Sequence, residues 1–179
     1  MKERRRGIET MEVSKVVFSA PLQQLMDEHV SLRADMDLFY DITEEIALDS
    51  GCDVVELFAQ LYKQVAAFEI KLKAHSRREE EGLFPLMTRH LAEDDGIIEV
   101  MEYEHEKAEQ HLKEFLAEAE KAGSTIDEDD VQWITVIAVQ AHATLQQHFA
   151  KEEKVLFPLA ENILSDDEKK ELERLFRGR

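Results

Sequence analysis

An eleven-residue pattern that occurs twice restricts what this chain can fold into and bind. The two copies span residues 75–85 and 148–158. They share a His, two consecutive Glu residues beginning four positions later, and a Leu-Phe-Pro ending. A His and a Glu four residues apart lie about one turn apart on the same side of an α-helix. Each copy therefore presents an imidazole and a carboxylate on one helical face, where both can reach a metal ion.

Two further histidines extend this repeat. His29 and His105 each lie one predicted helix upstream of a copy, and each follows a short acidic cluster. The larger repeat is a helix with one His followed by a helix with His-x-x-x-Glu. Two such units predict two metal ions, with iron as the first choice, held between four helices. The candidate metal ligands are His29, His75, Glu79, His105, His148 and Glu152.

The composition favours helix throughout the chain. Only six Gly and three Pro occur in 179 residues, so few residues suit hairpins and sheet turns. The length fits one domain with a proper core. We expect an all-α fold, an antiparallel up-down-up-down four-helix bundle. The expected parts are a disordered or irregular leader at residues 1–18, the bundle at 19–163, and a short C-terminal helix packed on it at 164–179.

Apolar residues recur at alternating steps of three and four, which is typical of a helix with one buried face. In the first helix the predicted inward positions are Leu22, Leu25, His29, Leu32, Met36, Phe39, Thr43 and Ile46. The same rhythm predicts three more long helices, and turn-forming residues separate the four at 49–53, 92–96 and 123–125. Ser165 begins a capping box for the terminal helix.

Counting along the helices predicts the heights of the histidines. At a rise of ~1.5 Å per residue, His29 lies about 33 Å before Gly51 in the first turn, and His75 lies about 36 Å after it. On the same rise, His105 and His148 lie about 30 and about 35 Å from the last turn. The two histidines of each hairpin should therefore face each other.

Charge and cysteine content exclude several classes of partner. The formal net charge of −18 makes a nucleic acid backbone and an anionic membrane surface repulsive, so neither is expected. The only cysteine, Cys52, excludes an intramolecular disulfide and suits a reducing compartment, which favours a cytoplasmic location. The longest apolar run, residues 133–145, is too short to span a bilayer.

A lone inward-facing His is more often a hydrogen-bonded core residue than a metal ligand. Six ionisable side chains in one core are costly unless they are paired or bind metal. Imidazole suits iron and zinc, and a carboxylate can bridge two ions through its two oxygens. Two iron ions are therefore expected, with an oxo or hydroxo bridge between them and a position open to a small ligand, while zinc or manganese could substitute.

Other ionisable residues lie off the inward faces or at their margins. Glu80 and Glu153 are rotated about 100° from the candidate carboxylates and are expected beside the ligands or at helix interfaces. Glu109 is a second-tier candidate ligand. The remaining histidines are expected at the surface or between helices: His90, His111 and His142.

Over roughly residues 20–162, these histidines and the Glu-Glu-x-x-Leu-Phe-Pro tails resemble the haemerythrin-like, cation-binding domain family. The resemblance implies a non-haem di-iron site built from the same six ligands, with Glu79 and Glu152 bridging the ions. The ligand pattern is also similar to that of bacterial di-iron proteins that repair damaged iron-sulfur centres. Oxygen-carrying members have a second His where this chain has Glu109, so carriage of oxygen by their asymmetric site is not expected.

Three functions remain open at this point. The protein could sense, scavenge or react with O2, NO or peroxide at an open di-metal site. It could instead donate iron to damaged iron-sulfur centres. The ions, zinc or a mixture included, could also be structural and without chemistry. The sequence leaves open whether the chain is an enzyme and which protein partner, if any, it has.

Overall fold

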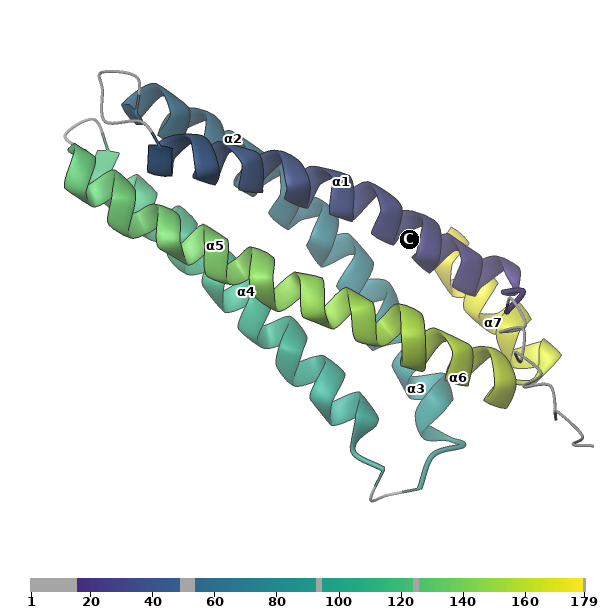
Figure 1. Cartoon of the computed structure of the whole chain (residues 1–179). Coiled ribbons are helices and arrows are strands. Elements are labelled where there is room, and N and C mark those ends of the chain that lie inside the picture. The colour runs from purple at the N-terminus through teal and green to yellow at the C-terminus, as the bar shows by residue number, and fades with distance from the viewer. Residues whose placement is uncertain (1–15, 49–53, 93–94, 124–125, 179) are drawn as a thin grey trace, which may run out of the picture.

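The structure, a computed structural model, describes residues 16–48, 54–92, 95–123 and 126–178. Four long helices run up and down in an antiparallel bundle, and no strand occurs in this part of the chain (Figure 1). The long helices are α1 (Ala20–Leu48), α2 (Val54–Arg78), α4 (Ile97–Ala122) and α5 (Glu128–Lys151). The predicted all-α bundle is thus confirmed.

All eight predicted inward positions of α1 are buried. Several other predictions fall on residues that the structure does not describe. Most of the predicted leader lies outside the described residues, and so do Cys52 and the predicted turn centre Gly51. Among the helices that are described, none combines the length and the apolar content that a membrane span needs.

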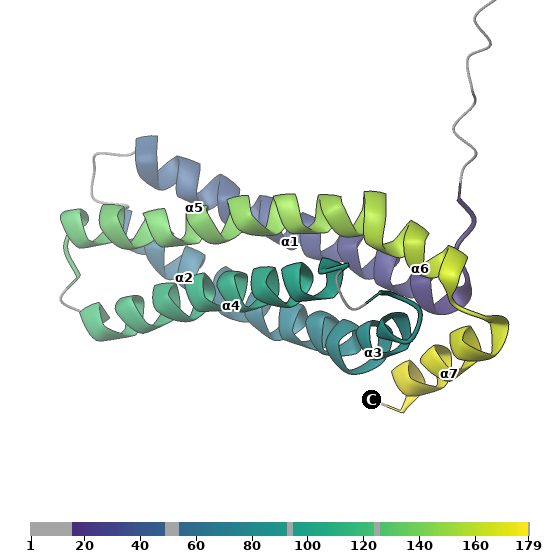
Figure 2. The ribbon, with the colours of Figure 1, turned by 90° about the horizontal axis from the view of Figure 1, so that it is seen from below.

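Each copy of the eleven-residue pattern contains a π-helical turn. These turns, η1 (Glu79–Leu83) and η3 (Glu152–Leu156), lead into the short helices α3 (Phe84–Thr88) and α6 (Phe157–Ile163). The N–H of Phe84 donates to the carbonyl oxygen of Glu79, five residues earlier, and Phe157 does the same to Glu152. A proline cannot donate such a bond, and the chain accommodates it with a wider turn and then continues as helix (Figure 2). Such π-turns are frequent at functional sites.

The core consists of two apolar clusters. One includes Leu32 and Leu72, and the other includes Leu25 and Leu83. His29 lies between Leu25 and Leu32 on α1, and His75 lies between Leu72 of α2 and Leu83 of η1. The histidines therefore occupy a polar layer between two apolar ones.

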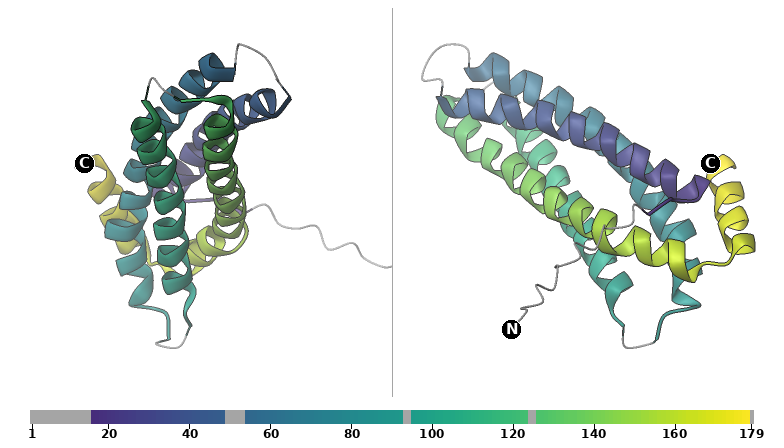
Figure 3. Two further views of the ribbon diagram at one scale, coloured as in Figure 1. Left: turned by 90° about the vertical axis from the view of Figure 1, so that its left-hand side faces the viewer. Right: turned by 45° about the vertical axis from the view of Figure 1, so that its right-hand side comes forward.

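The terminal helix α7 (Asp166–Arg177) lies across the end of the bundle at which α1 begins (Figure 3). A capping box between Ser165 and Glu168 begins it. A Cβ added at Gly82 of η1 would lie 3.1 Å from side-chain atoms of both Leu172 and Phe176. Gly82 thus permits the close approach of α7 to the first π-turn.

We expect Gly82→Val to destabilise the protein by about 2 kcal/mol, because overpacking a tight contact typically costs 1–3 kcal/mol. The matched control is Val155→Ala, since Val155 occupies the corresponding place in η3 and is 52% exposed. Urea unfolding of both variants measures the effect. An unchanged free energy of unfolding for Gly82→Val would show that α7 is not tightly seated on η1.

Candidate metal centre

The six predicted ligands come from all four long helices and both π-turns, and they meet in one buried layer. They are His29 of α1, His75 of α2, Glu79 of η1, His105 of α4, His148 of α5 and Glu152 of η3. Both carboxylates are 0% exposed, and no histidine of the layer is more than 4% exposed. The ring centroids are 4.7 Å apart in one hairpin and 4.6 Å apart in the other. The histidines of each hairpin face each other, as the counting predicted.

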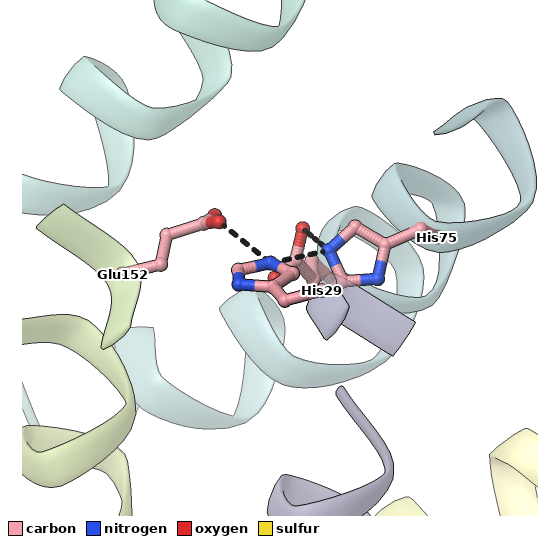
Figure 4. Close-up of side chains that lie close together, drawn as sticks. His29, His75 and Glu152 are labelled. Carbon is pink, nitrogen blue, oxygen red and sulfur yellow. Dashed lines mark hydrogen bonds and ion pairs between the residues drawn. The ribbon is translucent and has the colours of Figure 1, made fainter. Parts of the chain in front are cut away.

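In the first half of the layer two imidazoles point directly at each other. The Nε2 atoms of His29 and His75 are 3.0 Å apart, and Nε2 of His29 is 3.2 Å from Oε2 of Glu152 (Figure 4). Oε2 of Glu79 lies 3.4 Å from Nε2 of His75. Two ring nitrogens at this distance are favourable when one carries a proton, or when both face a cation.

The second half of the layer, which contains His105 and His148, has the same arrangement. Nε2 of His148 is 3.0 Å from Oε1 of Glu152, and Nε2 of His105 is 3.3 Å from Oε2 of Glu79. Glu79 therefore reaches a histidine in each half, and so does Glu152. Such placement is what a carboxylate bridging two ions needs.

An outer carboxylate accepts a hydrogen bond from the Nδ1 atom of every histidine in the layer. The pairs are Glu153 with His29 at 3.0 Å, Glu28 with His75 at 2.9 Å, Glu80 with His105 at 2.7 Å and Glu104 with His148 at 3.2 Å. These bonds fix the rings so that all four Nε2 atoms face the centre, as they do around bound metal ions. Glu80 and Glu153 thus lie beside the ligands.

The sequence reasoning did not identify Glu28 and Glu104. A signal was present, because each immediately precedes an inward histidine, His29 or His105. Burial alone would raise the pKa of Glu28, but the hydrogen bonds from His75 and Gln24 lower it below the usual value. Glu28 is therefore charged at neutral pH and can orient the His75 ring.

The layer contains polar atoms that contact one another but form no hydrogen bond with the protein. Both oxygens of Glu79, both oxygens of Glu152, and Nε2 of His105 and of His148 are buried without a hydrogen-bond partner. Buried polar groups are paired in the great majority of cases. A cation bound among these atoms would satisfy them, so the donors present fit a metal site.

Without a metal ion, protons and carboxylates must share this layer. Burial alone would lower the pKa of His105, but the carboxylates around it, led by Glu152, raise it to about 12. Burial alone would raise the pKa of Glu152, but the charge of His148 and the nearby His105 and His29 lower it well below its usual value. The metal-free layer therefore carries protonated imidazole next to ionised carboxylate.

The remaining candidates lie outside the layer. Glu109 accepts a hydrogen bond from Lys113 at 2.6 Å and is not among the side chains whose ligand atoms gather in the layer. His90 contacts Glu168 of α7, and His142 is stacked on Tyr40 with ring centroids 4.3 Å apart. His111 also lies outside both groups.

Six buried donors thus form two adjacent groups. Their ligand atoms lie within 4.8 Å of one another in each group, and the groups share Glu152. In a comparison with known families, the model of the Hemerythrin HHE cation binding domain matches residues 20–160, a segment that contains all six donors. A search of curated proteins and a search of solved structures return no match.

Proposed function

Because this chain belongs to the haemerythrin HHE cation-binding domain family, we propose that it is a non-haem di-iron protein that reacts with or senses O2, NO or peroxide. The observation that supports this most is the pair of buried donor groups that share Glu152. The six polar atoms without hydrogen-bond partners in the same layer support it further. No other group of three or more metal-ligating side chains occurs in the part of the chain that the structure describes.

The donor chemistry suits iron. Imidazole is a good iron ligand, and carboxylates that face two ions favour a bridged pair. Four histidines for two ions leave each ion with room for a small ligand. Bound iron would supply the redox chemistry for a reaction with O2, NO or peroxide. Zinc or manganese can use the same donors, so metal identity needs direct measurement.

Around this layer the chain supplies orientation and shielding. The ring of Phe149 stacks on His29 with centroids 4.2 Å apart, and Phe84 stacks on His105 at 5.7 Å. The outer carboxylates hold the Nδ1 protons. Together these contacts keep bulk water from the layer and limit rotation of the imidazoles.

Metal analysis with visible spectroscopy tests the proposal. We expect two irons per chain in protein purified without oxygen, and a charge-transfer band that arises when O2 or NO is added. His75→Ala combined with His148→Ala should remove the iron and the band. His142→Ala, which changes a histidine outside the layer, should retain both. Iron-free protein that stays colourless after loading with ferrous iron and then adding O2 or NO would contradict the proposal.

A second candidate is donation of iron to damaged iron-sulfur centres. It is favoured by an unequal distribution of donors, four in the group with His29 and three in the group with His105. The iron-loaded protein should then restore the activity of an iron-sulfur enzyme, while the His75→Ala, His148→Ala variant should not. A purely structural metal predicts unfolding on chelation, so a helical spectrum that survives chelation would exclude that role.

A further inference from the structure

The metal layer is built from two halves that repeat each other. His29 corresponds to His105, and His75 to His148, while Glu79 corresponds to Glu152. The repeat extends to the outer carboxylates: Glu80 and Glu153 each follow an inward carboxylate, and Glu28 and Glu104 each precede an inward histidine. Comparing corresponding positions therefore shows how the surroundings of the two halves of the metal layer differ.

Three of the four outer carboxylates are held by a basic side chain. Arg33 donates to Glu153 at 3.0 Å, and Arg78 donates to Glu28 at 3.3 Å. Lys151 donates to Glu104 in the corresponding place of the second half. A carboxylate held in this way can move only by breaking an ion pair, and the histidine that it orients is held with it.

Glu80, the outer carboxylate of His105, is different. Among the described residues no Lys or Arg forms a salt bridge with it, and its side chain is 42% exposed, against 25% for Glu153. The repeat explains why Glu80 has no such salt bridge. The position that corresponds to Arg33 is Glu109, which is negatively charged and therefore cannot form a salt bridge with Glu80. Glu109 accepts a hydrogen bond from Lys113 instead.

Two further differences indicate that the half with His105 and His148 is the less enclosed one. The half with His29 and His75 gathers four donors within 4.8 Å, whereas the half with His105 and His148 gathers three. Phe149 also stacks on His29 of the first half with ring centroids 4.2 Å apart, and lies farther from His75 and His148, at 6.1 and 5.9 Å. Its counterpart in the repeat is Ser76, which has no ring.

We propose that the two metal positions are inequivalent, and that the ion held by His105 and His148 is the exchangeable one, released on the side of Glu80. This rests on the proposed di-metal function and adds to it a direction of release. An exposed carboxylate without a cation exchanges its hydrogen bond for water at little cost, so the His105 ring can turn away from the ion. The His29 ring can turn away only by leaving Glu153, which cannot follow it because Arg33 holds it in place.

The test measures metal release instead of activity. The full chain is loaded with ferrous iron without oxygen and mixed with an excess of a chromophoric chelator. We expect two phases of equal amplitude. Glu109→Arg, which copies Arg33 into the second half, should slow the fast phase about tenfold, the scale on which partners of metal ligands act. Arg33→Glu should accelerate the slow phase by a similar factor and leave the fast phase unchanged.

Site assignment comes from the ligands themselves. His105→Ala should retain one slowly released ion, whereas His29→Ala should lose the slow phase. If His105→Ala does not fold, the Glu109→Arg result still decides the matter. Two ions released at one common rate, or a fast phase that survives in His105→Ala, would overturn the inference. Fewer than two ions per loaded wild-type chain would instead refute the di-metal function on which it rests.

Discussion

Glu152→Gln should abolish the binding of both metal ions. Glu152 belongs to both donor groups, with Oε2 3.2 Å from Nε2 of His29 and Oε1 3.0 Å from Nε2 of His148. The amide keeps the volume of the side chain, but it removes the charge and places an NH2 group where a cation would bind. Loss of a carboxylate outside the ligands typically costs 10–100-fold in metal affinity, so loss of a shared ligand should exceed about 100-fold for both ions.

Glu153→Gln is the matched control for this variant. Glu153 is the next residue in η3, but it contacts Nδ1 of His29 instead of facing the centre. It should weaken binding by roughly tenfold and leave two ions at saturating iron. Iron content after equilibration with a competing chelator distinguishes the two results. A Glu152→Gln protein that keeps one ion at wild-type affinity would show that this carboxylate serves a single position.

The long helices and the depth of the histidines could be predicted because both depend on periodicity. In α1 every predicted inward residue, from Leu22 to Ile46, is buried. Since burial on a helix repeats with the helical turn, one residue every three or four positions reveals the inward face. The equal heights of His29 and His75 follow from the same regular rise.

The π-turns could not be predicted in this way. They span five residues each, which is too short for a change of period to be visible in the sequence. Pro85 and Pro158 were the only local signal, and a proline is equally compatible with a kink or a helix end. Neither a simple kink nor a helix end describes what happens, because the helical turn widens by one residue and the helix continues.

The outer carboxylates Glu28 and Glu104 were missed for another physical reason. Each lies next to an inward histidine in sequence, and so points about 100° away from it on its own helix. A prediction that considers only the inward face of one helix therefore does not include such a residue among the site residues. In the structure Glu28 instead reaches His75 on the neighbouring helix. Pairing between helices depends on how they pack, which the pattern of a single helix does not contain.

Metal affinity should rise with pH by about tenfold per unit between pH 6.5 and 8, because binding at the second half must displace one proton. The pKa of His105 is raised from 6.5 to about 12 in the metal-free protein. Its protonated ring stabilises the metal-free fold fully below pH 6.5, and this contribution is lost as the pH rises through 12. Glu152 has a pKa lowered below 4.5, so its contribution is present above pH 4.5 and is lost on acidification through its lowered pKa.

The metal-free protein should therefore be most stable between about pH 4.5 and 6.5, where both contributions are complete. The metal-loaded protein should gain stability relative to it as the pH rises, since the ion replaces the proton on His105. Zinc competition with a chelator at pH 6.5 and 7.5, together with proton release in weakly buffered solution, measures this exchange. His142→Ala, outside the layer, should leave the slope unchanged. Affinity that is independent of pH would mean that the His105 ring is already neutral before the metal arrives.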